Sequence, residues 1–328
     1  MPIKLEQNIH QGYFLQTLDD VGKWINNTHN NLIAAGLVQT ADTGQVVSVS
    51  GSAVTTSTNT SYGYRVYELN DAFSSVVPVY IRLEFRSLSA VSSAGSRSMQ
   101  LVVGVGFATD GAGNIQDANY SKTLKQYQPI SSSAPALNPN ARTLTVKGDD
   151  FLFHGNELAT GYQTTNNLYE GGHFAVLRSK RNGVVDPTVV TFIFDRVNAA
   201  ASHNNFLPWG YVRLTKGNGV SSENTHIFRL PRIRTSNGML VAAEADISEN
   251  SILETTDRFV CMRTSIEDIG WSEFKLSTNG LSNKTYLQLP CSNITSNSAP
   301  SGVDKLFLTA VVDAVEPGFG CIGVLISE

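Results

Sequence analysis

The chain has 328 residues, of which 41% are hydrophobic and only 16% charged, and its formal net charge is −4. A chain of this length buries enough surface to fold without a metal or disulfide. The slight excess of acidic over basic residues argues against a nucleic-acid-binding protein, which usually carries a basic stripe. Basic clusters at Arg178 to Arg181 and at Arg229, Arg232 and Arg234 are interpreted as solvated charges at turns and strand edges.

The N-terminal part of the chain predicts an arm and a helix, residues 1–40. Residues 1–12 are polar, and we expect them to be mobile or docked on another surface. A helix is predicted from Gln11 to Ala35, because Gly36 suits its C-cap and its apolar residues recur as in a heptad seam: Phe14, Leu18, Val21, Ile25 and Leu32, with Thr28 in the gap. Two interpretations stay open. The seam packs on the chain's own β-body, or it projects to meet copies of the chain or another protein.

The stretch from Tyr62 to Asn114 predicts the centre of a sheet. Between Val79 and Phe85 the odd positions are large and apolar, and three others alternate with them: Tyr80, Arg82 and Glu84. Alternation of this kind is typical of a half-buried strand. The segment from Leu101 to Phe107 is predicted as its neighbour. The turn from Asp110 to Asn114 supplies too few oxygens for calcium, which needs six to eight, so a plain hairpin turn is favoured.

The remainder, from residue 116, predicts a long irregular excursion to Ala141 and then many short strands. Asn-Gly turns separate several of these strands, a pattern typical of a sandwich or barrel. We predict an all-β fold, with an antiparallel, jelly-roll-like β-sandwich body over residues 41–328 and one N-terminal amphipathic helix. A division into two sandwiches near residue 235 is the alternative. The strands are expected at Thr143–Lys147, His173–Arg178, Val189–Phe194, Tyr211–Leu214, His226–Leu230, Met239–Ala243, Phe259–Arg263, Tyr286–Leu289, Leu306–Val312 and Cys321–Ile326.

No motif in the sequence specifies a reaction. The signatures of serine hydrolases and zinc peptidases are absent. The three cysteines are odd in number and thirty residues apart, which argues against a disulfide framework or a metal site: Cys261, Cys291 and Cys321. His154 and Glu157 are three apart but beside a glycine in an expected turn. Adjacent carboxylates, at Asp149-Asp150 and Glu267-Asp268, point to opposite faces of a strand and do not converge. We therefore predict a protein that is not an enzyme and has no cofactor or metal.

Aromatic residues in turn-rich stretches offer the alternative of a carbohydrate- or receptor-binding module, because exposed rings stack on sugars. These residues are Tyr162, Trp209, Tyr211 and Trp271. Aromatic residues are more commonly buried in a core or a subunit interface than used to bind sugars.

Four phrases of the sequence occur in an order that resembles virion structural proteins of tailed bacteriophages. They are AGLVQTADTGQ (residues 35–45), YGYRVYELNDAF (62–73), PVYIRLEF (78–85) and LVVGVGFATDGAGN (101–114). The resemblance covers roughly residues 30–115. It implies a β-rich component of the tail, neck or baseplate region, with copies of itself (a ring or trimer) and neighbouring virion proteins as partners. A host surface glycan is the alternative partner.

The expected location is the virion, after synthesis in the host cytoplasm. No secretory pattern opens the chain, and no stretch approaches 18 apolar residues. We therefore expect neither a membrane nor a nucleic acid as partner.

Overall fold

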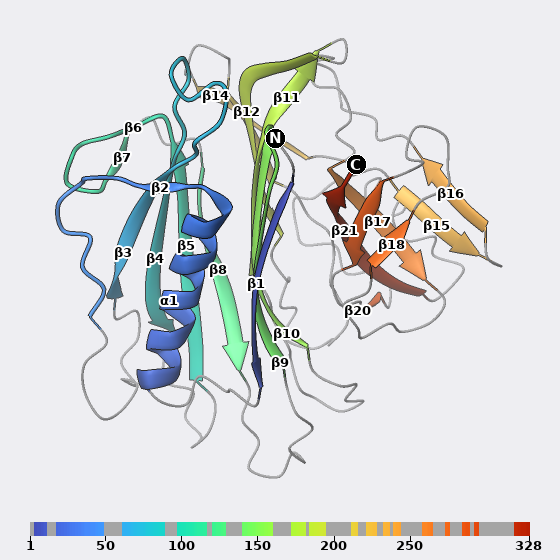
Figure 1. Cartoon of the computed structure of the whole chain (residues 1–328), viewed down its shortest axis with the longest axis horizontal. Helices are drawn as coiled ribbons and strands as arrows, with labels where there is room; N and C mark the ends of the chain where they lie inside the picture. The colour runs from blue at the N-terminus through green and yellow to red at the C-terminus, as the bar shows by residue number, and fades with distance from the viewer. Residues whose placement is uncertain are drawn as a thin grey trace.

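The computed structural model is built from β-sheets with one helix packed against them (Figure 1). It describes residues 3–11, 18–48, 61–88, 97–116, 120–128, 140–159, 172–181, 184–194, 211–215, 221–227, 232–236, 239–243, 258–264, 273–275, 284–288, 292–294 and 318–328. The predicted fold class, an antiparallel all-β body with an N-terminal helix, is confirmed. Most neighbouring strands in the described sheets are consecutive in the chain.

The five-stranded sheet contains the block from Tyr62 to Phe107. Its strand order is β2 (Val38–Gln39), β3 (Ser61–Glu68), β4 (Tyr80–Leu88), β5 (Arg97–Gly106) and β8 (Tyr120–Gln128). A small hairpin, β6 (Ala108–Thr109) and β7 (Ile115–Gln116), follows β5. The irregular excursion predicted for residues 116–141 is wrong in part, because β8 pairs with β5 from Arg97 to Val105. Strand β8 lies at the edge of the sheet and its sequence is mostly polar, so it shows no clear apolar alternation from which a strand could be predicted.

The central sheet has seven strands and includes the N-terminal arm. Its order is β1 (Lys4–Gln11), β9 (Asn140–Lys147), β10 (Phe151–Ala159), β11 (Gly172–Arg181), β12 (Val184–Phe194), β13 (Tyr211–Thr215) and β14 (Ser221–Ile227). Strand β1 pairs with β9 from Lys4↔Lys147 to Gln11↔Asn140. The arm is therefore docked on the chain's own β-body. The helix start predicted at Gln11 is wrong, since that residue ends β1.

The C-terminal sheet begins at β15, close to the predicted division near residue 235. Its order is β16 (Met239–Ala243), β15 (Arg232–Ser236), β17 (Phe259–Thr264), β21 (Gly318–Ser327), β19 (Thr285–Gln288) and β18 (Glu273–Lys275), with β20 (Ser292–Ile294) also paired to β21. Strands β15 and β17 are parallel, unlike the other pairs described. The change of sheet falls between β14 and β15, and the division into two sandwiches stays a prediction.

The central sheet lies between two other layers. Figure 1 shows α1 (Leu18–Ala35) and the five-stranded sheet on one side of it and strands β17 and β21 on the other. Successive residues of β10 from Phe151 to Gly155, and of β11 from Phe174 to Arg178, are all buried. A strand covered on both faces shows a continuous buried run without alternation. The turn predicted at His154 and Gly155 is wrong for this reason. His154 is fully buried in β10, with its Nδ1 2.8 Å from Thr145 Oγ1.

The helix seam belongs to the core of the chain. Val21, Ile25 and Leu32 are at most 1% exposed, and Thr28 fills the predicted gap at 0%. Trp24 meets the Phe85 ring edge-on at 5.0 Å. These three seam residues belong to one core cluster with residues of both the five-stranded and the central sheet, so within the chain the seam packs on its own β-body. Phe14 lies outside the described residues, as does the side chain of Leu18.

The end of α1 follows the predicted C-cap. Gly36 adopts φ 104°, its amide donates to the Ile33 carbonyl at 2.9 Å, and the Leu37 amide donates to the Leu32 carbonyl at 3.0 Å. These two bonds form a Schellman motif, which requires a left-handed residue. No helix in the described ranges is long and apolar enough to cross a membrane.

Candidate functional site

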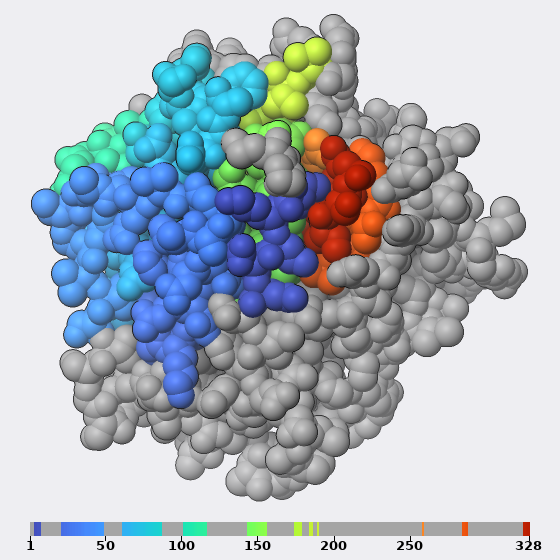
Figure 2. Space-filling view, in the orientation of Figure 1, coloured from blue at the N-terminus to red at the C-terminus, as the bar shows by residue number. Residues whose placement is uncertain are grey.

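Three separate segments from the first third of the chain meet on the outer face of the five-stranded sheet. Residues 40–45, Tyr64 and residues 109–114 are linked by hydrogen bonds, and together we call them the clasp. In Figure 2 the β6–β7 hairpin lies beside the blue N-terminal segment at the surface of the molecule. Segments that are distant in the sequence thus form one structural feature, since Thr43 and Gly111 are in contact although 68 residues separate them.

Gln45 holds the first loop of the clasp. Its Nε2 donates to the carbonyl oxygens of Thr40, at 2.8 Å, and Asp42, at 3.0 Å. Its Oε1 accepts the backbone N–H of Val66 at 2.7 Å. The side chain therefore satisfies the backbone of a loop and also attaches that loop to β3, as a strand ladder would otherwise do.

Asp110 organises the second loop. Its Oδ1 accepts the backbone N–H groups of Ala112, at 2.8 Å, and Asn114, at 3.0 Å, and its Oδ2 accepts the Asn114 amide at 2.6 Å. The bonds from Asn114 first, and then that from Ala112, lower the pKa of Asp110. The hairpin turn predicted here is confirmed by the pairing of β6 with β7. Donors within the turn already engage both carboxylate oxygens.

Tyr64 joins the two loops. Its hydroxyl lies 2.8 Å from the Ala112 carbonyl oxygen and 3.0 Å from that of Thr43. The Thr43 amide also donates to the Gly111 carbonyl at 2.9 Å. Gly113 has φ 83°, and a Cβ there would lie 2.2 Å from the Tyr64 ring. Only glycine fits between the turn and the ring, so the clasp depends on that residue type.

A partly buried ion cluster on β4, formed by Arg82, Glu84 and Arg86, contacts the clasp through Tyr64. The Arg82 guanidinium lies 4.3 Å from the centroid of the Tyr64 ring. Arg82 and Arg86 each bind a different oxygen of Glu84 at 2.7 Å. Burial by itself would raise the pKa of Glu84, but hydrogen bonds from Arg86, Arg82 and Ser61 outweigh it and lower the pKa to about 2. Glu84 is therefore a carboxylate at all physiological pH values.

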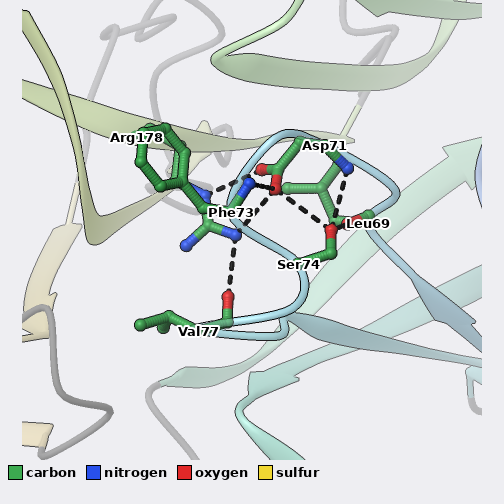
Figure 3. A network of polar contacts seen from close by, with 6 residues as sticks. All are labelled: Leu69, Asp71, Phe73, Ser74, Val77 and Arg178. Carbon is green, nitrogen blue, oxygen red and sulfur yellow. Dashed lines mark hydrogen bonds and ion pairs between the residues drawn. The ribbon is translucent and has the colours of Figure 1, made fainter.

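A second polar network joins the five-stranded sheet to the central sheet (Figure 3). Arg178 of β11 binds both oxygens of Asp71, with Nε 2.7 Å from Oδ2 and Nη2 3.1 Å from Oδ1. Its Nη2 also donates to the Val77 carbonyl at 2.8 Å. The two charged side chains are only 0% and 3% exposed. The prediction that Arg178 is a solvated charge is wrong, because the β3–β4 loop folds over it.

The structure does not describe the side chains of the aromatic residues predicted to contact a glycan. Tyr162, Trp209 and Trp271 lie outside the described residues, and Tyr211 begins β13 with its side chain undescribed. In the part of the chain that is described, no three His, Cys, Asp or Glu side chains gather in a way that could hold a metal ion. Burial lowers the pKa of His29 and of Lys147, but these groups belong to different layers.

Sequence reasoning missed Gln45 and Tyr64 as the organisers of the clasp. The available signal was the pair of short Gly-containing turns, Asp42-Thr43-Gly44 and Asp110-Gly111-Ala112-Gly113, on either side of an aromatic-rich strand. Comparison with known proteins adds no relative, since no protein-family model, curated protein or solved structure matches the chain.

Proposed function

We propose that this protein is a structural component of a tailed-phage virion, assembled through symmetric protein–protein contacts in the tail, neck or baseplate region. One observation carries the proposal. Three of the four phrases on which the resemblance rests contribute residues to the clasp, a single surface feature. Shared phrases that build the same exposed loops are what a common contact surface would need.

The construction of the clasp favours a role in contact over a role in catalysis. Its polar side chains are used to fix its own loops, as the contacts of Gln45, Asp110 and Tyr64 illustrate. What it offers to a partner is a fixed shape with exposed residues at Thr43 and Gly111. Loops held by a rigid scaffold commonly carry binding surfaces, and a preorganised loop loses less entropy on association.

Symmetric assembly gives such a surface its function. In a ring or closed oligomer each copy uses the same patches, so one rigid loop pair can set the geometry of every contact. A standard interface buries ~800 Å² on each partner, an area that a loop pair and the neighbouring sheet surface can supply together.

Two variants test the proposal in the virus. Gly113→Ala places a side chain against Tyr64, whereas Gly111→Ala has the same left-handed backbone at φ 75° and nothing within 4 Å of its new Cβ. We expect mass spectrometry to detect the wild-type chain and the Gly111→Ala chain in purified particles at a fixed ratio to the other virion proteins. Gly113→Ala should be depleted in particles while its soluble pool remains folded. Absence of the wild-type chain from particles would disprove the proposal.

A further inference from the structure

Arg65 is an arginine without a carboxylate partner in the described part of the chain. It lies on the helix-facing side of β3, opposite Leu83 of β4 and two residues before Tyr67. Its side chain is half-buried, and its Nη1 is buried without a hydrogen-bond partner. Other arginines of the chain pair with acids: Arg82, Arg86, Arg178 and Arg258. Arg65 hydrogen-bonds Tyr67, but its buried Nη1 lacks an acceptor, and an unpaired buried guanidinium N–H costs free energy.

The groups beside Arg65 are neutral hydrogen-bonding side chains. His29 of α1 places its Nδ1 3.1 Å from the Tyr67 hydroxyl, with the two rings 5.9 Å apart. Burial, and then the charge of Arg65, lower the pKa of His29, so its imidazole is neutral at pH 7. Burial raises the pKa of Tyr67 to about 12 against the opposing influence of Arg65, so the phenol is neutral too. One uncompensated positive charge therefore remains among Arg65, Tyr67 and His29.

The position is open to solvent at one side. Arg65 and His29 are both partly exposed, and Ile33, one turn after His29 on the same side of α1, is 40% exposed. A small ligand group would therefore meet the exposed part of Arg65 first, because the Nη1 atom itself is buried. A guanidinium accepts carboxylates in a planar, two-bond geometry, which makes a carboxylate the best-matched acceptor.

We propose that Arg65, with Tyr67 and His29 beside it, forms a binding site for a carboxylate at the junction of α1 and β3. The bound oxygens accept N–H groups of Arg65 and supply the negative charge that Arg82, Arg86, Arg178 and Arg258 obtain from acids within the chain. The site is separate from the clasp, which lies on the opposite face of the five-stranded sheet, and it does not depend on the proposed function.

The probe for this site is acetate, added to the purified full-length protein at constant ionic strength with chloride as the balancing anion. The imidazole NMR signals of His29, assigned by their loss in His29→Gln, report on the site because of the contact with Tyr67. We expect a saturable shift of these signals with acetate and a rise in the pKa of His29, since the bound anion offsets the charge of Arg65.

Arg65→Gln should abolish the acetate-dependent shift. Arg86→Gln is the matched control, because it removes an arginine of the same sheet that already has an acid partner, and its acetate response should equal that of the wild type. Acetate should also raise the melting temperature of the wild type and of Arg86→Gln, but not of Arg65→Gln. A wild-type protein with no saturable response, or an equal response in Arg65→Gln, would overturn the inference.

Discussion

The two faces of the five-stranded sheet are stabilised in different ways. On β4 the face toward α1 is apolar and fully buried, with Ile81, Leu83 and Phe85 all at 0% exposure. The outer face carries Tyr64, Arg82 and Glu84, which are held by a cation–π contact and an ion pair. Gly113 leaves room for the Tyr64 ring, so the clasp also depends on a glycine at that position. A buried apolar face is destabilised mainly by substitutions that remove side-chain volume. The clasp depends instead on the left-handed backbone conformation of its glycines, so it is destabilised by residues that are strained in that conformation. Each of the following predictions tests that distinction.

Phe85→Ala should have the largest effect on stability. The ring is fully buried and in edge contact with Trp24, so its removal leaves a cavity between α1 and the sheet. We expect a loss of about 3–5 kcal/mol in the free energy of unfolding, measured by denaturant titration. Phe85→Leu, which keeps most of the volume, should lose much less. Equal losses in the two variants would show that this face does not depend on volume.

Asp71→Ala should cost about 3 kcal/mol, because it leaves the buried Arg178 guanidinium without its carboxylate. The loss is measured by the same denaturant titration. Adding Arg178→Met should recover a large part of it, since the double variant has no uncompensated buried charge. Asp110→Ala serves as a comparison, because that carboxylate is exposed and acts only within its turn. A double variant as unstable as the single one would contradict this account of the network.

Gly113→Ala should destabilise the protein more than Gly111→Ala. Both residues are left-handed, so each change costs about 1–2 kcal/mol in backbone strain. Only the new Cβ at Gly113 collides with Tyr64, which adds about 1 kcal/mol or more through the loss of the hydroxyl contacts. In a Tyr64→Ala background the difference between the two variants should vanish. A difference that persists there would mean that Tyr64 is not the obstacle.

Glu84→Gln should have an effect that depends on pH. The pKa of Glu84 falls from 4.5 to about 2 on folding, so its ionised form stabilises the protein above pH 4.5, and this contribution is lost as the pH falls through 2. With both arginines partly exposed, we expect a loss of about 1–2 kcal/mol at pH 7. Unfolding measurements from pH 7 to 2 should show the wild type and the variant converging. A constant difference would exclude this ion cluster as the cause.

Gly22→Ala should be the smallest change, and it should be stabilising. Gly22 lies in α1, and a Cβ there would meet nothing within 4 Å. Replacing a helical glycine by alanine typically adds up to about 1 kcal/mol. A small rise in melting temperature would show that the low helix propensity of glycine, and not a packing requirement, determines the stability of α1 at this position. A fall would indicate an unrecognised close contact.

The sequence predicts those parts of the fold in which one face is buried. The alternation from Val79 to Phe85 gave β4, and Gly36 gave the end of α1, because each pattern reflects local geometry. It could not predict β10 from its periodicity, since burial on both faces removes the alternation. Nor could it tell a heptad seam that binds another protein from one that packs on its own sheet, because Val21, Ile25 and Leu32 suit either.

The contacts of the candidate site depend on partners distant in sequence. Arg178 belongs to a basic run that suggests a solvated surface. Its contact with Asp71, which lies 107 residues earlier in the chain, shows that it is buried in an ion pair. Tyr64 and Ala112 meet across 48 residues in the clasp. The unpaired state of Arg65 likewise follows from which acids the fold brings near each arginine. Such pairings are set by strand register, which a single sequence does not specify.

The most direct test of the proposed contact role of the clasp is hydrogen–deuterium exchange of the full-length protein, free in solution and within the particle of which we propose it to be a component. The account predicts that peptides covering residues 40–45 and 109–114 gain protection on assembly, in the wild type and in Gly111→Ala particles alike. Unchanged exchange in both loops, with new protection confined to other surfaces, would contradict it.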